Sequence, residues 1–138
     1  MNIVRWDPFR SFFNDSDFFP AALDSPERAS WAPTIDAFEK DHRLVIRAEV
    51  PGVERDDIEV RIEDGELVLG GERKRDVEFK DENAYRRERV YGSFSRRFRL
   101  PDTLDLDKVD AKYENGVLTI EIPKSEASQP RKIKIRAA

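Results

Sequence analysis

Apolar and charged residues alternate along much of the chain between residues 34 and 124. In the stretch from 58 to 63, every second residue is apolar and the residues between them carry charge. An extended strand would place the apolar residues on one face and the charged residues on the other, whereas a helix would scatter them around its axis. The alternation therefore predicts short β-strands that each bury a single face.

Turn signals separate these stretches at short intervals. Asp64-Gly65 and Asn115-Gly116 stand between alternating runs, and each predicts a tight β-hairpin. Other runs end at proline or glycine: Pro51-Gly52, Gly70-Gly71, Pro101 and Pro123. We expect strands over residues 43–50, 58–63, 67–69, 94–100, 109–113 and 117–122. This series predicts an all-β fold, an immunoglobulin-like antiparallel β-sandwich, over residues 34–124.

The composition agrees with strands that are charged on one face. Of the 138 residues, 38% are hydrophobic and 39% are charged, whereas roughly 25% are charged in ordinary globular chains. The sequence contains no run of about 18 apolar residues, so we do not expect an integral membrane protein. A formal net charge of −4 argues against general affinity for nucleic acid or for an anionic membrane surface.

The residues that most catalytic and metal sites require are scarce. The chain has no cysteine, and its single histidine, His42, lies beside Asp41 at a predicted turn. Gly70-Gly71 is followed by Glu72 and not by the Lys-Ser or Lys-Thr of a phosphate-binding loop. With 29 acidic residues, the occurrence of carboxylate pairs carries no information. We therefore expect no enzyme activity, no catalytic residue, no metal and no cofactor.

Residues 1–33 differ in sequence pattern from the rest, because prolines interrupt them and apolar and charged residues do not alternate over any sustained length. Seven of the 14 aromatic residues lie within the first 31 positions: Trp6, Phe9, Phe12, Phe13, Phe18, Phe19 and Trp31. These aromatics either belong to the core of the β-domain or form an N-terminal arm that binds non-native proteins and other copies of the chain. We favour the arm. Charged residues interrupt every apolar stretch near the start, which does not fit a secretory signal and predicts a cytoplasmic protein.

Two further segments lie outside the predicted strands. Residues 72–92 form a long and mostly charged connection, and connections of this length inside a compact domain are often functional. Residues 125–138 begin with a polar spacer and end with Ile133 and Ile135 among basic residues. On an extended segment both isoleucines would point the same way. The end is either a last strand of the sandwich or a tail that adds to a sheet edge of another subunit.

The segment 94–99 superficially resembles a nucleic-acid surface. Arg96, Arg97 and Arg99 interleave there with Phe94 and Phe98, and aromatic residues among cations can stack on bases. On a strand, however, the two phenylalanines share one face with Arg96, while Arg97 and Arg99 share the other. We expect the phenylalanines to lie in the core and the protein to bind no nucleic acid.

Five segments of the chain resemble motifs of the small heat-shock proteins, the family built around the alpha-crystallin domain. They are Trp6-Asp7-Pro8-Phe9, Val50-Pro51-Gly52-Val53, the arginine-rich run from Phe94 to Pro101, Ala111 with Gly116-Val117-Leu118, and Ile133-Lys134-Ile135. Each motif alone is weakly specific, but the five occur in the family's order and cover essentially the whole chain. The first is similar to a segment common in bacterial and plant members, while the arm between residues 10 and 32 matches no pattern.

The resemblance implies an ATP-independent holdase chaperone, which binds unfolding proteins and prevents their aggregation under heat or other stress. It also implies a dynamic homo-oligomer built from strand-swapped dimers. The implied dimer contacts lie within residues 83–89 and on the arginine-rich strand: Tyr85, Arg86, Arg87, Glu88, Arg89 and Arg96. The implied tail contacts place Ile133 and Ile135 in a groove lined by Ile58, Val60, Ile62, Val109 and Tyr113. A monomeric β-sandwich that acts as a co-chaperone adaptor is the alternative.

Overall fold

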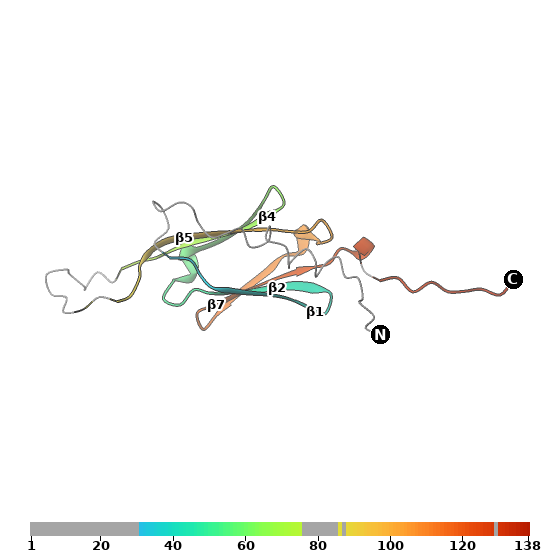
Figure 1. Ribbon diagram of the computed structural model, residues 1–138, viewed down its shortest axis with the longest axis horizontal. Coiled ribbons are helices and arrows are strands. Elements are labelled where there is room, and N and C mark those ends of the chain that lie inside the picture. The colour runs from blue at the N-terminus through green and yellow to red at the C-terminus, as the bar shows by residue number, and fades with distance from the viewer. Residues whose placement is uncertain (1–30, 76–85, 87, 129) are drawn as a thin grey trace, which may run out of the picture.

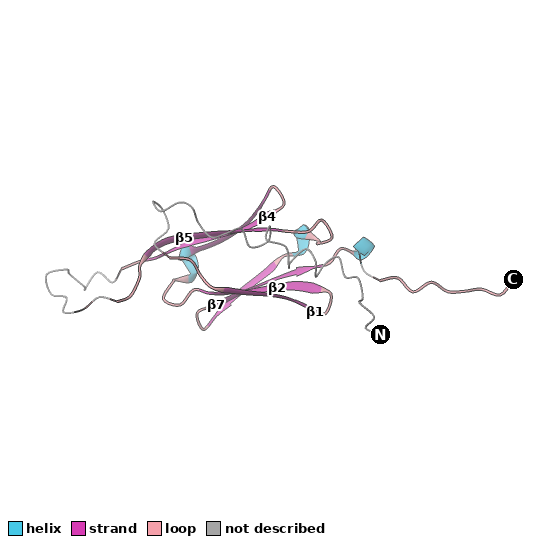
Figure 2. Ribbon diagram, in the orientation of Figure 1, coloured by secondary structure: helices cyan, strands magenta, loops and turns pink. Residues whose placement is uncertain are grey.

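The computed structural model describes residues 31–75, 86, 88–128 and 130–138. These residues form two antiparallel sheets that pack face to face (Figures 1 and 2). One sheet has the order β1-β2-β7-β6, formed by Ile35–Lys40, Arg43–Glu49, Val117–Pro123 and Asp110–Glu114. The other has the order β3-β4-β5, formed by Ile58–Glu63, Glu66–Arg73 and Gly92–Arg99. Short 3-10 turns lie at η1 (Arg55–Asp57), η3 (Leu106–Lys108) and η4 (Glu126–Ser128). The predicted all-β, immunoglobulin-like sandwich is confirmed.

Alternate residues of the strands build one core between the sheets. Phe98 of β5 is fully buried, and Phe94 is 3% exposed, while Arg97 and Arg99 of the same strand face solvent. This confirms the assignment of the two phenylalanines to the core. The remaining buried cluster is made of Leu44, Ile46, Ala48, Val50, Val53, Leu67, Leu69, Leu100, Leu104, Leu118, Ile120 and Ile122. Among the residues described, no polar or charged side chain is buried.

Three hairpins in the described part of the chain turn through two residues at positive φ. They are Asp41-His42, Asp64-Gly65 and Asn115-Gly116, with φ between 51° and 77°. Two-residue loops of this kind twist in the sense that the flanking strands require. The Asp-Gly and Asn-Gly hairpins are confirmed. The sequence did not predict β1, because Asp41-His42 lacks the glycine that marks the other two hairpins.

Gly71 lies inside a strand, and the prediction that Gly70-Gly71 ends that strand is wrong. β4 continues to Arg73, and Gly71 stands opposite Ile58 on one side and Phe94 on the other. A Cβ atom at Gly71 would clash with the backbone oxygen of Asp57 and lie 2.7 Å from Cζ of Phe94. At Gly70 the nearest atom, the backbone oxygen of Phe94, would be 3.6 Å away. Gly71 is therefore needed for close packing, not for a turn.

We expect Gly71→Ala to lower the free energy of unfolding by about 2 kcal/mol, because the added methyl group meets a backbone atom and a buried ring. Gly70→Ala is the matched control and should change it by less than about 0.5 kcal/mol, since the methyl group enters ordinary van der Waals contact. Urea unfolding of both variants checks this. Equal midpoints for the two variants would show that Gly71 has no packing role.

Candidate assembly and client-binding sites

The two strands predicted to hold the tail are both edge strands. β3 ends the order of one sheet and β6 ends the order of the other. Ile58, Val60 and Ile62 of β3 are half-buried against the core, as are Tyr113 of β6 and Val109 just before it. An edge strand carries unpaired backbone groups that another chain can use. The five residues thus lie where a strand can be added, and the groove itself stays a prediction.

Tyr113 of the edge strand β6 contacts the connection that leads into β3, the edge strand of the other sheet. Its hydroxyl lies 2.8 Å from the backbone oxygen of Val53 and 3.2 Å from that of Val50. Both carbonyls flank the Pro51-Gly52 turn, which continues through η1 into β3. A phenol hydroxyl has one proton, so it donates to these two acceptors in turn or shares the proton between them. Tyr113 therefore positions β6 relative to the start of β3.

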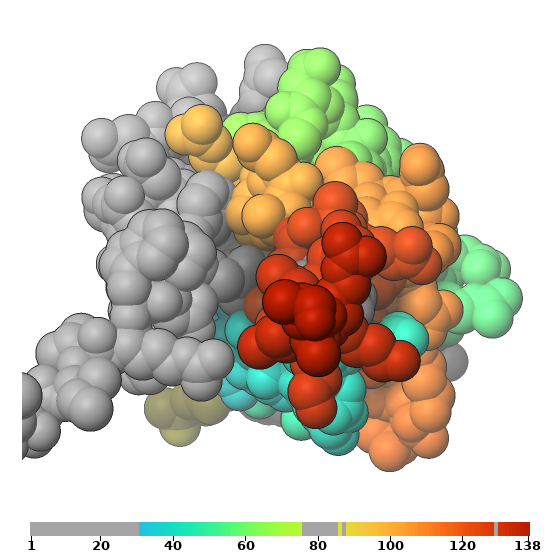
Figure 3. Space-filling view, turned by 90° about the vertical axis from the view of Figure 1, so that its right-hand side faces the viewer, coloured from blue at the N-terminus to red at the C-terminus, as the bar shows by residue number. Residues whose placement is uncertain are grey.

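The C-terminal tail leaves the sandwich at a defined point. The Ser128 hydroxyl donates to the backbone oxygen of Thr103 at 2.9 Å, and residues 130–138 belong to neither sheet. Figure 1 shows the tail running away from the sandwich, and the end-on view in Figure 3 shows it projecting toward the viewer. Ile133 is 85% exposed and Ile135 is 98% exposed. The tail is thus not a last strand of its own sandwich, and docking on another subunit stays a prediction.

Trp31 is the one member of the aromatic set that the structure describes, and it packs on the sandwich. Its ring centroid lies 4.7 Å from that of Phe94, and its Nε1 donates to the backbone oxygen of Gly92 at 3.1 Å. The guanidinium carbon of Arg73 lies 3.8 Å from its ring centroid. For Trp31 these contacts agree with the interpretation as a core residue. Phe9 and the other five lie outside the described residues, and a client-binding role stays a prediction for all seven.

Arg96 contacts the residues just before β1. Its Nη1 donates to the backbone oxygen of Pro33 at 2.8 Å, and its guanidinium carbon lies 5.2 Å from the Phe98 ring centroid. Burial lowers the pKa of the Arg96 guanidinium, and Pro33 is fully buried. Because Arg96 and Pro33 are 63 positions apart, no local sequence signal could have predicted this contact. The structure therefore gives Arg96 a role within one chain, while its contact with a partner subunit stays a prediction.

The charged connection before β5 carries the other predicted dimer residues. Nε of Arg86 lies 2.8 Å from Oε1 of Glu88, and both side chains are exposed. The guanidinium carbon of Arg89 lies 5.3 Å from the ring centroid of Tyr91. Tyr85 and Arg87 lie outside the described residues. Strand exchange requires a second chain, so these dimer contacts stay a prediction.

The described ranges contain no three His, Cys, Asp or Glu residues placed to hold a metal ion. No helix among them is long and apolar enough to cross a membrane. His42 is exposed in the turn between β1 and β2, where the sequence placed it.

Comparison with known families identifies the family to which the chain belongs. The model of the Hsp20/alpha crystallin family matches residues 36–136. The chain therefore belongs to this family, and the resemblance to small heat-shock proteins is confirmed. Family membership supports a chaperone role rather than an enzymatic one.

Named relatives occur in plants and bacteria. The chain is 40% identical over 126 residues to the 16.9 kDa class I heat shock protein 1 of Oryza sativa subsp. japonica. The aligned residues cover 91% of this chain and 83% of the rice protein. It is 36% identical to the small heat shock protein C4 of Rickettsia felis, over 94% and 78% of the two chains.

Solved structures of small heat-shock proteins are similar to the structure of this chain. A small heat-shock protein from Xylella fastidiosa matches with a TM-score of 0.68 and 43% identity, over 79% of this chain and all of the other. Heat shock protein 16.0 from Schizosaccharomyces pombe matches with a TM-score of 0.74 and 32% identity, over 92% and 91% of the two chains.

We expect Arg96→Gln to lower the free energy of unfolding by about 2 kcal/mol, because the buried Pro33 carbonyl loses a charged donor. Arg97→Gln is the matched control. Its Nη1 pairs with Oε2 of Glu66 at 3.0 Å between exposed side chains, so the loss should stay under about 0.5 kcal/mol. Both are measured by urea unfolding at equal protein concentration. If Arg96→Gln alters assembly but leaves the unfolding midpoint unchanged, the contact with Pro33 does not stabilise the domain.

Proposed function

We propose that this protein is an ATP-independent holdase that binds unfolding proteins and prevents their aggregation under heat or other stress. It works as a dynamic homo-oligomer assembled from strand-swapped dimers in the cytoplasm. Membership of the Hsp20/alpha crystallin family supports the chaperone role. One structural observation carries the assembly part of the proposal: Ile133 and Ile135 are 85% and 98% exposed, beyond the last contacts of the chain with its own sandwich.

The exposed isoleucines favour binding of the tail to another copy of the chain. Full burial of one isoleucine side chain is worth about 1.5–3 kcal/mol, and the chain's own sandwich does not cover either residue. An extended tail can add its backbone to β3 or β6, where Ile58, Val60 and Tyr113 lie at the edges. The proposed contact uses apolar side chains for affinity and backbone hydrogen bonds for direction.

Client binding is assigned to the aromatic arm. Trp6, Phe9, Phe12, Phe13, Phe18 and Phe19 provide large apolar groups that can contact the apolar surface of an unfolding protein. Such contacts consume no nucleotide. The outer faces of the strands are charged, as in the exposed pairs of Arg61 with Glu59 and Glu63, and a charged surface keeps client complexes in solution.

The dimer contacts are assigned to the connection before β5. Tyr85, Arg86, Arg87, Glu88 and Arg89 form the exchanged strand in this proposal. The described members of this set, Arg86, Glu88 and Arg89, are exposed and belong to no strand of their own chain.

Replacing Ile133 and Ile135 by alanine should shrink the oligomer without unfolding the domain, because the tail loses both apolar side chains while residues 31–128 keep their contacts. Lys132→Ala with Lys134→Ala is the matched control, since the same spacing places both changes on the opposite side of an extended tail. Light scattering measures the size, and circular dichroism checks the fold. An unchanged size distribution for the isoleucine variant would contradict tail docking.

Heating an aggregating client with this protein and without ATP should give less turbidity than heating the client alone. A chain that starts at Trp31 should protect less, because it lacks six of the arm aromatics but keeps the contacts of Trp31 and Pro33 with the sandwich. Turbidity at a stoichiometric excess of chaperone is the measurement. Lack of suppression by the full chain would defeat the holdase proposal, and equal protection by both chains would defeat the assignment to the arm.

A mass near 16.1 kDa at micromolar concentration, measured by light scattering, would favour the monomeric adaptor instead.

A further inference from the structure

Trp31 contacts both ends of the connection between β4 and β5, which contains the residues proposed for strand exchange. The guanidinium carbon of Arg73, the last residue of β4, lies 3.8 Å from the Trp31 ring centroid. Nε1 of Trp31 donates at 3.1 Å to the backbone oxygen of Gly92, the first residue of β5. Arg73 and Gly92 also form the last residue pair between the two strands. Trp31 therefore lies where the connection leaves the sheet and where it returns.

The side chain of Arg73 joins Trp31 to the returning chain. Its Nη1 donates to the backbone oxygen of Val90 at 3.2 Å, while its guanidinium carbon lies over the indole ring. The negative face of an indole ring attracts a cation in this position. Nε of Arg73 is buried and has no hydrogen-bond partner in the described part of the chain. Loss of the Trp31 ring would thus remove a contact that holds the guanidinium against Val90.

Gly92 lets the chain change direction where it enters β5. Its φ is +117°, a conformation that residues with side chains rarely adopt. Val90, two residues earlier, belongs to no strand and is 45% exposed. A residue at the end of a strand can absorb a large change in backbone angles, and glycine does so without steric cost. Because the Trp31 hydrogen bond ends on the carbonyl of Gly92, it holds this hinge in one direction.

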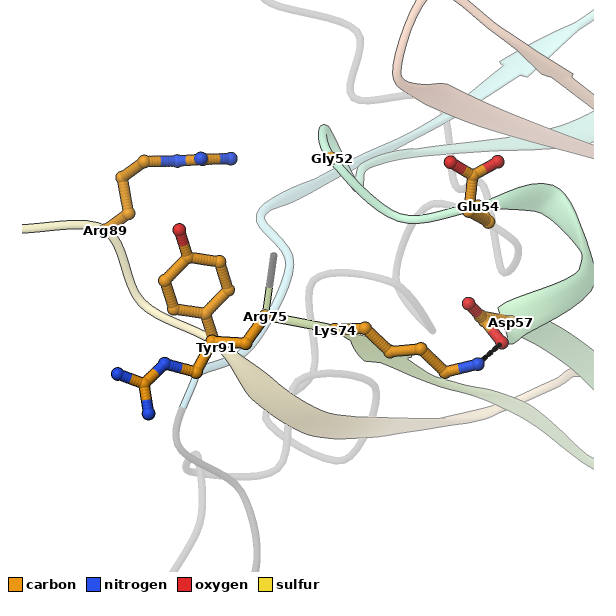
Figure 4. Close-up of a pocket in the computed structure, with 7 residues that line it drawn as sticks. All are labelled: Gly52, Glu54, Asp57, Lys74, Arg75, Arg89 and Tyr91. Carbon is orange, nitrogen blue, oxygen red and sulfur yellow. Dashed lines mark ion pairs between the residues drawn. The ribbon is translucent and has the colours of Figure 1, made fainter. Parts of the chain in front are cut away.

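The other end of the connection has a weaker restraint. Nζ of Lys74 lies 2.8 Å from Oδ1 of Asp57 in η1, and Figure 4 shows Lys74 turned toward that carboxylate. The Lys74 side chain is 63% exposed, and exposed ion pairs contribute little to stability. The ring centroid of Trp31, by contrast, lies 4.7 Å from that of the buried Phe94. Trp31 is therefore the stronger of these two restraints.

The residues that follow Trp31 are anchored separately. Nη1 of Arg96 donates to the backbone oxygen of Pro33 at 2.8 Å. The backbone nitrogen of Glu49 donates to the backbone oxygen of Thr34 at 3.0 Å, and β1 begins directly after this contact. Trp31 can therefore leave its partners while β1 keeps its place in the sheet.

We propose that Trp31 is a latch that couples the N-terminal arm to strand exchange between subunits. While Trp31 is bound, it fixes the direction of the chain at Gly92 and slows exchange. Movement of the arm, as when it binds a client, pulls Trp31 away from Gly92 and Arg73 and frees the connection to exchange. This inference rests on the strand-swapped dimer of the proposed function. Trp31 acts through Gly92 and Arg73, so it is a positioning residue.

Native-state hydrogen exchange of the full chain, measured on residues 90–94, tests the latch. Trp31→Ala should speed exchange there about tenfold, because it removes both the hydrogen bond and the ring contacts. Trp31→Phe should speed it about threefold, since a phenyl ring can still pack on Arg73 and Phe94 but has no N–H to donate. Residues 44–48 in the core report opening of the whole domain and serve as the reference.

Mixing isotope-labelled with unlabelled full chains, followed by native mass spectrometry, measures exchange between subunits. Trp31→Ala should speed this mixing about tenfold, because the same contacts restrain the connection. Phe38→Ala is the matched control for both measurements. It removes another partly buried ring near a guanidinium, that of Arg47 at 5.2 Å, on β1 and not at the ends of the connection.

Faster hydrogen exchange at residues 90–94 together with faster mixing supports the proposal, provided that residues 44–48 are unchanged. An unchanged rate at residues 90–94 in Trp31→Ala overturns it, as does an equal effect of Phe38→Ala. Faster hydrogen exchange without faster mixing overturns the coupling to strand exchange. A wild-type chain that is monomeric in light scattering contradicts the proposed dimer and the coupling with it, whereas the other failures leave the dimer intact.

Discussion

Two sheets bury their inner faces against each other, and among the described residues no charged side chain lies between them. The strands can meet this condition because every second residue is apolar, so that Ile46, Ala48 and Val50 point inward. Arg47 and Glu49 between them are exposed. A chain that is 39% charged thereby obtains a dry core. Neither sheet closes into a barrel, so each sheet has two edge strands.

The sequence predicted the features that depend on neighbouring residues. Alternation located the strands other than β1, and the Asp64-Gly65 and Asn115-Gly116 pairs located two hairpins, because glycine marks a turn at positive φ. The strand boundary was wrongly predicted where a glycine serves close packing and not a turn. The prediction that the strand ends at Gly70-Gly71 is wrong, because Gly71 lies within β4 and lets Phe94 approach the backbone.

Contacts between residues that are far apart in the sequence could not be predicted from it. Trp31 packs beside Phe94, and Arg96 binds the carbonyl of Pro33 across 63 positions. The predicted arm covers residues 1–33, and Trp31 within it packs on the sandwich. The aromatic-rich segment therefore joins the domain through a residue that is itself well packed. For the candidate site, motif order predicted the tail and edge residues. The hydrogen bonds of Tyr113 to the carbonyls of Val50 and Val53 join residues 63 and 60 positions apart and have no local signal.

The anchoring of the tail at Ser128 has a geometric consequence for the assembly. Ile135, the end of the isoleucine pair, is the seventh residue after this anchor, and an extended chain spans at most about 3.3–3.6 Å per residue. In the proposed assembly the receiving edge of the neighbouring subunit must therefore lie within about 25 Å of Ser128. The tail then acts as a tether of limited length. A count of residues therefore sets an upper limit on the spacing between subunits, independently of how strongly the isoleucines bind.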